Sequence, residues 1–331
     1  MKRIVQLLLL AAILFVPAVS LAVHDDFLPT LLRETAGTQD RLSAIRLKDR
    51  WFALGRESGH LDIWDVDRPK FRRTIKAHAS RVSELAFGRN GAIIISNAQF
   101  EGDTKVWLVK TGELLVSIPD ARGPVFETWR KNIYLIANGS EVWLFDLAKK
   151  KPLIEKYRIE GDVTAVAGDK ASGLIVMGTA SGAMETWQLL DGEAGAPVMK
   201  KLAGKVPYME GNWIIGIHFS KTRGSFFSVA RNGNVAEWKA DTLQEIRTIP
   251  IKLAMIYSSA FLPGPELLAL GGSVNAAGYG GGYVEIKPLV SSDSVMHKAI
   301  GNISFVEFFP SKSSVLVAHS FAMGMYAYRT D

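Results

Sequence analysis

Polar and apolar residues alternate in short stretches that recur along this chain. The stretches end in a large aromatic residue, as Leu61–Trp64, Thr104–Trp107 and Val235–Trp238 do. Strict alternation with a period of two is typical of a β-strand with one buried face. The sequence therefore predicts a set of similar half-buried strands. Their last aromatic residues are Trp64, Trp107, Phe145, Trp187 and Trp238, with phenylalanine in place of tryptophan in the third copy.

Each aromatic position belongs to a longer repeat. In the second copy, strands over Arg81–Phe87 and Ala92–Asn97 precede Trp107, and a turn leads from Trp107 to a fourth strand over Leu114–Ile118. Successive aromatic positions lie 38 to 51 residues apart. Four strands in a repeat of about 40 residues is the signature of a β-propeller blade. Two weaker copies follow, the sixth with Lys287 in the aromatic place, so we predict an all-β fold, a seven-bladed β-propeller of four-stranded antiparallel blades.

The seventh copy has three recognisable strands, and residues 29–35 resemble the strand that precedes a new blade elsewhere. Pairing of this N-terminal strand with the C-terminal blade would close the ring and remove two open sheet edges. We therefore predict a single domain over residues 23–331. Its blades are expected at approximately 41–76, 81–118, 122–159, 162–204, 212–251, 255–301, and 304–329 together with 29–35.

The first 22 residues have the layout of a secretory signal. Two basic residues precede an apolar run over Ile4–Val16, and small residues at Ser20 and Ala22 form a cleavage site. We expect cleavage after Ala22 and a mature chain in the periplasm. The alternative is an uncleaved inner-membrane tether, because Ile4–Val23 is long enough to span a thin bilayer.

The composition argues against several classes of site. The chain has no cysteine, which excludes disulfides, a lipoprotein anchor and thiolate-held clusters. Its six histidines lack metal-ligand spacing, and no Gly-x-Ser-x-Gly motif is present, so we expect no metal, no cofactor and no catalytic residue. The net charge of +6 is mild, and its basic clusters are not interleaved with aromatic residues, so we expect no nucleic acid partner.

The second repeat resembles the WD40 family. Ala77–His78, Ser96 and Val106–Trp107 match the family's His, Ser and Trp positions, Glu101 stands where the family has Asp, and Trp64–Asp65 reproduces the family's dipeptide. The resemblance covers roughly residues 29–331 and weakens towards the C-terminus. It implies a propeller braced by hydrogen bonds. The positions expected to be structural are Trp64, Asp65, His78, Ser96, Trp107, Phe145, Trp187 and Trp238.

Three connections are candidates for a partner surface. The long link Met199–Asn212, the glycine-rich loop Gly271–Gly282 and the turn Gln99–Asp103 should open on one face of the disc, by the geometry of the resembled family. Long loops in compact domains are often functional. The residues expected to contact a partner are Phe100, Glu101, Tyr208, Met209, Glu210, Asn275 and Tyr279.

The resemblance implies a binding scaffold. WD40-like accessory proteins include assembly factors of respiratory or cofactor-containing enzymes, so we expect a monomeric, non-catalytic periplasmic scaffold that binds another periplasmic protein and, after cleavage, no membrane. An alternative is a propeller that binds a quinone, a haem derivative or a metal in its central channel. A quinoprotein-like enzyme, suggested by the Thr-Gly turn at Lys110–Glu113, is a weaker alternative because the adjacent cysteines of such enzymes are absent.

Overall fold

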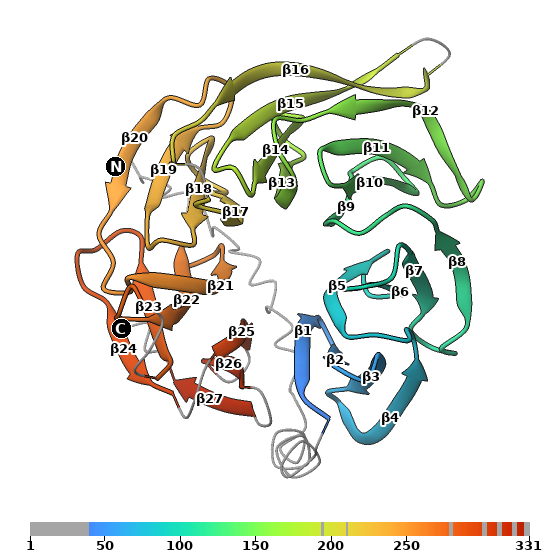
Figure 1. Cartoon of the computed structure of the whole chain (residues 1–331), viewed down its shortest axis with the longest axis horizontal. Coiled ribbons are helices and arrows are strands. Elements are labelled where there is room, and N and C mark those ends of the chain that lie inside the picture. Colours follow the sequence, from blue (N-terminus) through green and yellow to red (C-terminus); the bar gives the residue numbers. More distant parts are fainter. Residues whose placement is uncertain are drawn as a thin grey trace, which may run out of the picture.

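The computed structural model describes residues 40–192, 195–209, 211–277, 281–299, 303–309, 313–319 and 323–327. Over these residues the chain is all-β, and its sheets are arranged radially around a central axis, as in a β-propeller (Figure 1). Six antiparallel sheets have four strands each, and the seventh has three. The expected signal peptide, residues 1–22, and the expected closing strand, residues 29–35, lie outside the described residues.

Each blade is a meander of consecutive strands, with its first strand nearest the axis and its last strand at the periphery (Figure 1). Blade 1 comprises β1 (Leu42–Lys48), β2 (Trp51–Arg56), β3 (His60–Asp65) and β4 (Arg68–Lys76). Blade 2 comprises β5 (Val82–Gly88), β6 (Ile93–Ala98), β7 (Thr104–Leu108) and β8 (Leu114–Ile118). Blade 3 comprises β9 (Val125–Glu127), β10 (Ile133–Asn138), β11 (Glu141–Asp146) and β12 (Lys151–Arg158). Blade 4 comprises β13 (Val163–Asp169), β14 (Leu174–Thr179), β15 (Met184–Asp191) and β16 (Pro197–Lys205). Blade 5 comprises β17 (Ile214–Phe219), β18 (Ser225–Ala230), β19 (Val235–Lys239) and β20 (Glu245–Ile249). Blade 6 comprises β21 (Met255–Leu262), β22 (Leu267–Ser273), β23 (Tyr283–Pro288) and β24 (Val295–Lys298). Blade 7 comprises β25 (Ile303–Phe309), β26 (Ser314–His319) and β27 (Met323–Ala327).

Within the described residues the expected strands are present, and two of the expected loops need new limits. Met199–Lys205 belongs to β16, which pairs with β15 along its whole length, so the link to blade 5 is residues 206–213 and is shorter than expected. Gly271–Ser273 belongs to β22, so the loop after it is residues 274–282. In both cases the expected loop begins inside a strand, because backbone pairing with the neighbouring strand continues through residues of low strand propensity.

In the described residues the apolar core is divided into seven clusters, and each lies between two adjacent blades. Trp107 of β7 packs with Ala53 and Ile63 of blade 1, and Trp64 of β3 packs with Phe309 and Leu316 of blade 7. The seventh sheet is therefore packed against the first as well as against the sixth. All five aromatic positions expected to be structural are buried, at 1% to 7% exposure. The packing between blades that the repeat predicts is confirmed.

At three of the junctions between blades, close approach of the neighbours requires glycine. Gly55, Gly178 and Gly271 are each the fifth residue of the second strand of their blade. A Cβ atom at Gly178 would lie 2.5 Å from Ile214 Cγ2 in the first strand of the next blade, and the other two glycines meet Val82 and Ile303 in the same way. A side chain at these positions would push adjacent blades apart.

Replacing Gly178 by Ala should lower the free energy of unfolding by about 1–3 kcal/mol, because the added methyl overpacks the junction between blades 4 and 5. Urea denaturation followed by tryptophan fluorescence would measure this loss. Gly264→Ala is the matched control, since no atom lies within 4 Å of its added Cβ. Equal losses in the two variants would contradict the packing explanation.

Candidate functional site

The two faces of the disc carry different kinds of connection. In a four-stranded antiparallel blade, the loop between the second and third strands and the link to the next blade lie at the same end of the strands. We call this end of the disc the link face and the opposite end the hairpin face. Backbone hydrogen bonds join neighbours on the link face: His78 N–H donates to Gly59 O at 3.0 Å, and Ala121 N–H donates to Gly102 O at 2.8 Å. The three connections expected to share a face, now residues 99–103, 206–213 and 274–282, all lie on the link face.

Among the described residues, five of the eleven exposed large apolar side chains lie on link-face loops. Phe100 is 78% exposed and Met209 is 80% exposed, while Val206, Trp213 and Val274 are about half exposed. In the described hairpin-face loops, one large apolar side chain is similarly exposed, that of Val290 at 68%. The other exposed large apolar residues lie on outer strands of the blades. The five link-face side chains come from loops of blades 2, 4 and 6, so each offers a separate apolar contact point on this face.

The expected partner-binding residues fall into three groups. Phe100 and Met209 point outward, and Asn275 is exposed in a turn where its Oδ1 accepts a hydrogen bond from Ala277 N–H at 2.9 Å. Glu101 and Tyr208 instead bind neighbouring parts of the fold. Glu210 and Tyr279 lie outside the described residues.

Glu101 completes the hydrogen-bond network expected from the WD40 resemblance. His78 Nε2 lies 2.8 Å from Ser96 Oγ, which also accepts a hydrogen bond from Trp107 Nε1–H at 3.0 Å. His78 Nδ1 lies 2.8 Å from Glu101 Oε2. Burial opposes ionisation of Glu101, but hydrogen bonds from His78, the Ala79 N–H and Lys105 outweigh it and lower its pKa to about 2. Glu101 is therefore an ionised brace between the incoming link and blade 2.

Tyr208 makes the equivalent brace in blade 5. Its hydroxyl lies 2.7 Å from Ser228 Oγ, which accepts a hydrogen bond from Trp238 Nε1–H at 2.7 Å. Ser228 and Ser96 are each the fourth residue of the second strand, so tyrosine here takes the place of histidine. Burial raises the pKa of Tyr208 to about 12. Its inward placement differs from the expected role as a partner contact, and the serine ten residues before Trp238 was the signal that could have revealed it.

Acidic residues two positions before the aromatic place also brace links, and the sequence analysis did not identify them. Glu185 is buried in blade 4, where it accepts hydrogen bonds from Trp187 Nε1–H at 2.9 Å and from the Glu160 N–H of the incoming link at 3.0 Å. Glu285 accepts a hydrogen bond from the Lys252 N–H at 2.7 Å in blade 6. Side chains of several chemical types thus hold the links of this face to the strands of the blades.

Asp65 anchors a turn on the opposite face. Its buried carboxylate accepts hydrogen bonds from Arg50, from Arg68 Nε at 2.8 Å and from the Asp67 N–H at 3.1 Å. Burial opposes ionisation, but these hydrogen bonds outweigh it and lower the pKa of Asp65. Asp65 thus holds the turn from β3 to β4 in place.

Titratable side chains gather on the first strands, which lie nearest the central axis (Figure 1). Arg46 Nη1 of β1 lies 3.7 Å from Glu307 Oε2 of β25, and His218 Nε2 of β17 lies 3.0 Å from Ser259 Oγ of β21. Burial raises the pKa of Glu84 and of Glu307, and burial lowers the pKa of His218 to about 4. Within the described residues, no three or more His, Asp or Glu side chains are grouped so that they could hold a metal ion.

The described part of the chain contains no helix that is long and apolar enough to cross a membrane.

We expect His218 to make stability depend on pH. Its folded pKa, about 4, lies below the ordinary value of 6.5, so its contribution is present above pH 6.5 and is lost as the pH falls towards 4. Relative to His218→Gln, the wild type should lose up to about 3 kcal/mol of unfolding free energy across this interval, as measured by urea denaturation at several pH values. The raised pKa values of Glu84 and Glu307 act in both proteins and cancel in the difference. Parallel pH profiles would contradict the burial of a neutral His218.

We expect the brace in blade 5 to stabilise the fold. Ser228→Ala leaves the Trp238 N–H and the Tyr208 hydroxyl without their shared acceptor and should cost about 1–3 kcal/mol, whereas Tyr208→Phe should cost about 1 kcal/mol. Denaturant unfolding would measure both losses. Tyr257→Phe is the control, because no hydrogen bond joins that hydroxyl to another described residue. A loss as large in the control as in Tyr208→Phe would contradict this role.

No family model matches the chain. Telomerase protein component 1 of Mus musculus is 24% identical over 219 residues, and its counterpart in Rattus norvegicus is 24% identical over 221 residues. Each match covers 63% of this chain and 8% of the relative, so the chain corresponds to a small part of those proteins. The crystal structure of the computationally designed Ika8 protein is similar in fold, with a TM-score of 0.61 and 18% identity over 88% of this chain and 98% of that one. The chain is thus a β-propeller with WD40-like repeats, distantly related to telomerase protein component 1.

Proposed function

We propose that this protein is a non-catalytic interaction scaffold that binds another protein through its link face. The observation that supports this most directly is the group of exposed apolar side chains on link-face loops, led by Phe100 and Met209. Exposure of large apolar groups on a rigid surface favours association, because their burial against a partner removes apolar area from water. The braces beneath the loops hold these side chains in place before a partner arrives, which lowers the entropic cost of binding.

The charge of the two faces also differs. The described link-face loops carry four basic and six acidic residues, and the described hairpin-face loops carry ten basic and six acidic residues. The link face is therefore mildly acidic and the hairpin face basic. This asymmetry favours a partner whose contact surface combines apolar groups with basic residues.

We place this scaffold in the periplasm, on the evidence of the secretory layout of residues 1–22, as an accessory or assembly factor of a respiratory or cofactor-containing enzyme. The similar mouse and rat proteins are named as protein components of telomerase, which is compatible with a role of this propeller type within larger assemblies. That likeness supports the general role.

The proposal includes a closed, seven-bladed ring. In the described residues, blade 7 has three strands where the other blades have four. Residues 29–35 have the pattern of the missing strand, and their addition to β27 would protect its outer edge. A closed ring would keep the link face rigid around its whole circumference.

Affinity capture with the mature protein from the periplasm of its source bacterium tests the function. We expect a reproducible protein partner, at least tenfold weaker recovery with Phe100→Ser plus Met209→Ser, and unchanged thermal unfolding, since both side chains are exposed. Val290→Ser, on the hairpin face, is the matched control and should retain the partner. Absence of any reproducible partner, or equal loss with the control, would overturn the proposal.

A further inference from the structure

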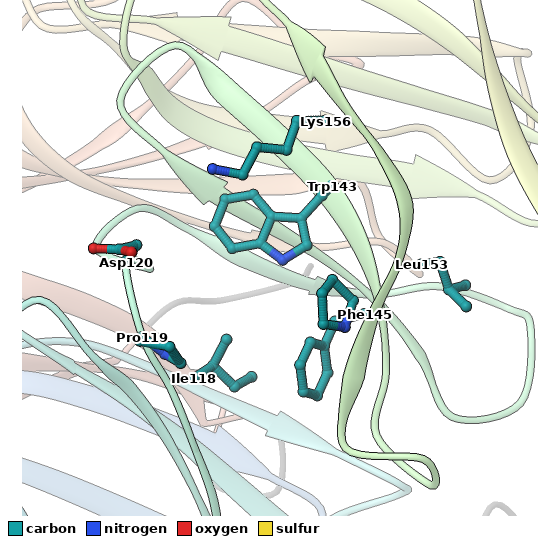
Figure 2. Close-up of a pocket in the computed structure, with 8 residues that line it drawn as sticks. Ile118, Pro119, Asp120, Trp143, Phe145, Leu153 and Lys156 are labelled. Atoms are coloured by element: carbon teal, nitrogen blue, oxygen red, sulfur yellow. The ribbon is translucent and has the colours of Figure 1, made fainter.

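A pocket of about 320 Å³ lies between blades 2 and 3, near the outer edge of the disc (Figure 2). Blade 2 contributes Ile118, and the link that follows contributes Pro119 and Asp120. Blade 3 contributes side chains from β11 and β12. These are Trp143, Phe145, Pro152, Leu153 and Lys156.

The pocket occurs where the repeat departs from its own pattern. Phe145 occupies the place where blades 1, 2, 4 and 5 have tryptophan. The register shift beside it, between the third and fourth strands, is common to these five blades. A phenyl ring fills less space than an indole ring, and the side chains around it are held by the strands on either side. A tryptophan at position 145 would need more of the space between blades 2 and 3 than Phe145 takes.

The walls and the rim of the pocket have different chemistry. Aromatic and aliphatic groups line the interior, and the Lys156 ammonium lies over the Trp143 ring, 5.2 Å from its centroid (Figure 2). Lys156 Nζ also binds Glu141 Oε2 at 2.8 Å, so its charge is already paired. The carboxylate of Asp120 is exposed and makes no hydrogen bond or ion pair with another described residue. Asp120 is thus the charge at the rim that is available to a ligand.

The segment of blade 2 that lines the pocket is joined by hydrogen bonds to a loop of the link face. Ala121, next to Asp120, donates its N–H to Gly102 O at 2.8 Å, and Ser117 Oγ donates to Asp103 Oδ2 at 2.9 Å. Both contacts attach the wall of the pocket to the loop that exposes Phe100. A partner that covers Phe100 can therefore place an adjoining segment of its own chain in the pocket.

We propose that this pocket holds one apolar side chain of an extended segment of the partner protein, with a Lys or Arg of the same segment paired to Asp120. The inference rests on the proposed scaffold function and names the chemistry of its partner. The volume is at the lower end of the roughly 300–1,000 Å³ of small-molecule sites, which suits one or two side chains. The acidic excess of the link-face loops favours the same basic segment.

Selection from a random displayed peptide library on the full-length protein tests this inference. We expect selected peptides to share an apolar residue close to Lys or Arg. For a labelled peptide of this kind, fluorescence anisotropy should show at least about tenfold weaker binding to Phe145→Trp, which fills the pocket, and weaker, less salt-dependent binding to Asp120→Asn. Asparagine also tolerates the positive φ of 52° at position 120, so this second variant tests the rim without altering the core.

Several results would overturn the inference: failure to enrich any peptide, enrichment of acidic peptides, or full-strength binding to Phe145→Trp and to Asp120→Asn. Phe145→Trp restores the residue of the repeat, and thermal unfolding verifies that it is folded. If Phe100→Ser plus Met209→Ser abolishes partner capture while both pocket variants retain it, the pocket proposal fails and the link-face scaffold stands. If no partner is captured although peptides bind the pocket as described, the scaffold function fails separately.

Discussion

No sheet of this protein can bury its two apolar faces by itself, and this constraint determines the rest of the structure. Each of the seven apolar clusters is built from two blades, so every blade depends on both of its neighbours. The contact of Trp64 with Phe309 extends this rule across the junction of the first and last blades. At three of the junctions the blades stack so closely that only glycine fits, as at Gly178.

Stacking alone does not hold the links between blades, and polar side chains do this in several chemical forms. Histidine and glutamate brace blade 2, tyrosine braces blade 5, and glutamate alone braces blades 4 and 6. In each case a buried donor or acceptor is satisfied between the incoming link and the strands of the blade. The common requirement is a hydrogen bond at that place, and residues of different types meet it.

Adjacent residues on the link face consequently have opposite roles. Glu101 turns inward and Phe100 outward, and the same alternation separates Tyr208 from Met209. The residue that fixes the loop thereby orients its exposed neighbour. The pocket beside Phe145 is a second feature that a partner could contact. It lies in the blade where phenylalanine replaces the tryptophan of the repeat.

The sequence by itself determined the strands and their grouping into blades, because period-two alternation is a local pattern. The brace at His78 was implied by the resemblance of His78, Ser96 and Trp107 to the WD40 family. It also identified Phe100 and Met209 as surface residues of exposed loops. Only the tertiary structure decided which polar residues turn inward, as with Tyr208 and Glu185, and where β16 ends. It also brought together His218 and Ser259, which are 41 residues apart. The physical reason is that such partners come from different strands or blades, and their contacts exist only after the blades have stacked.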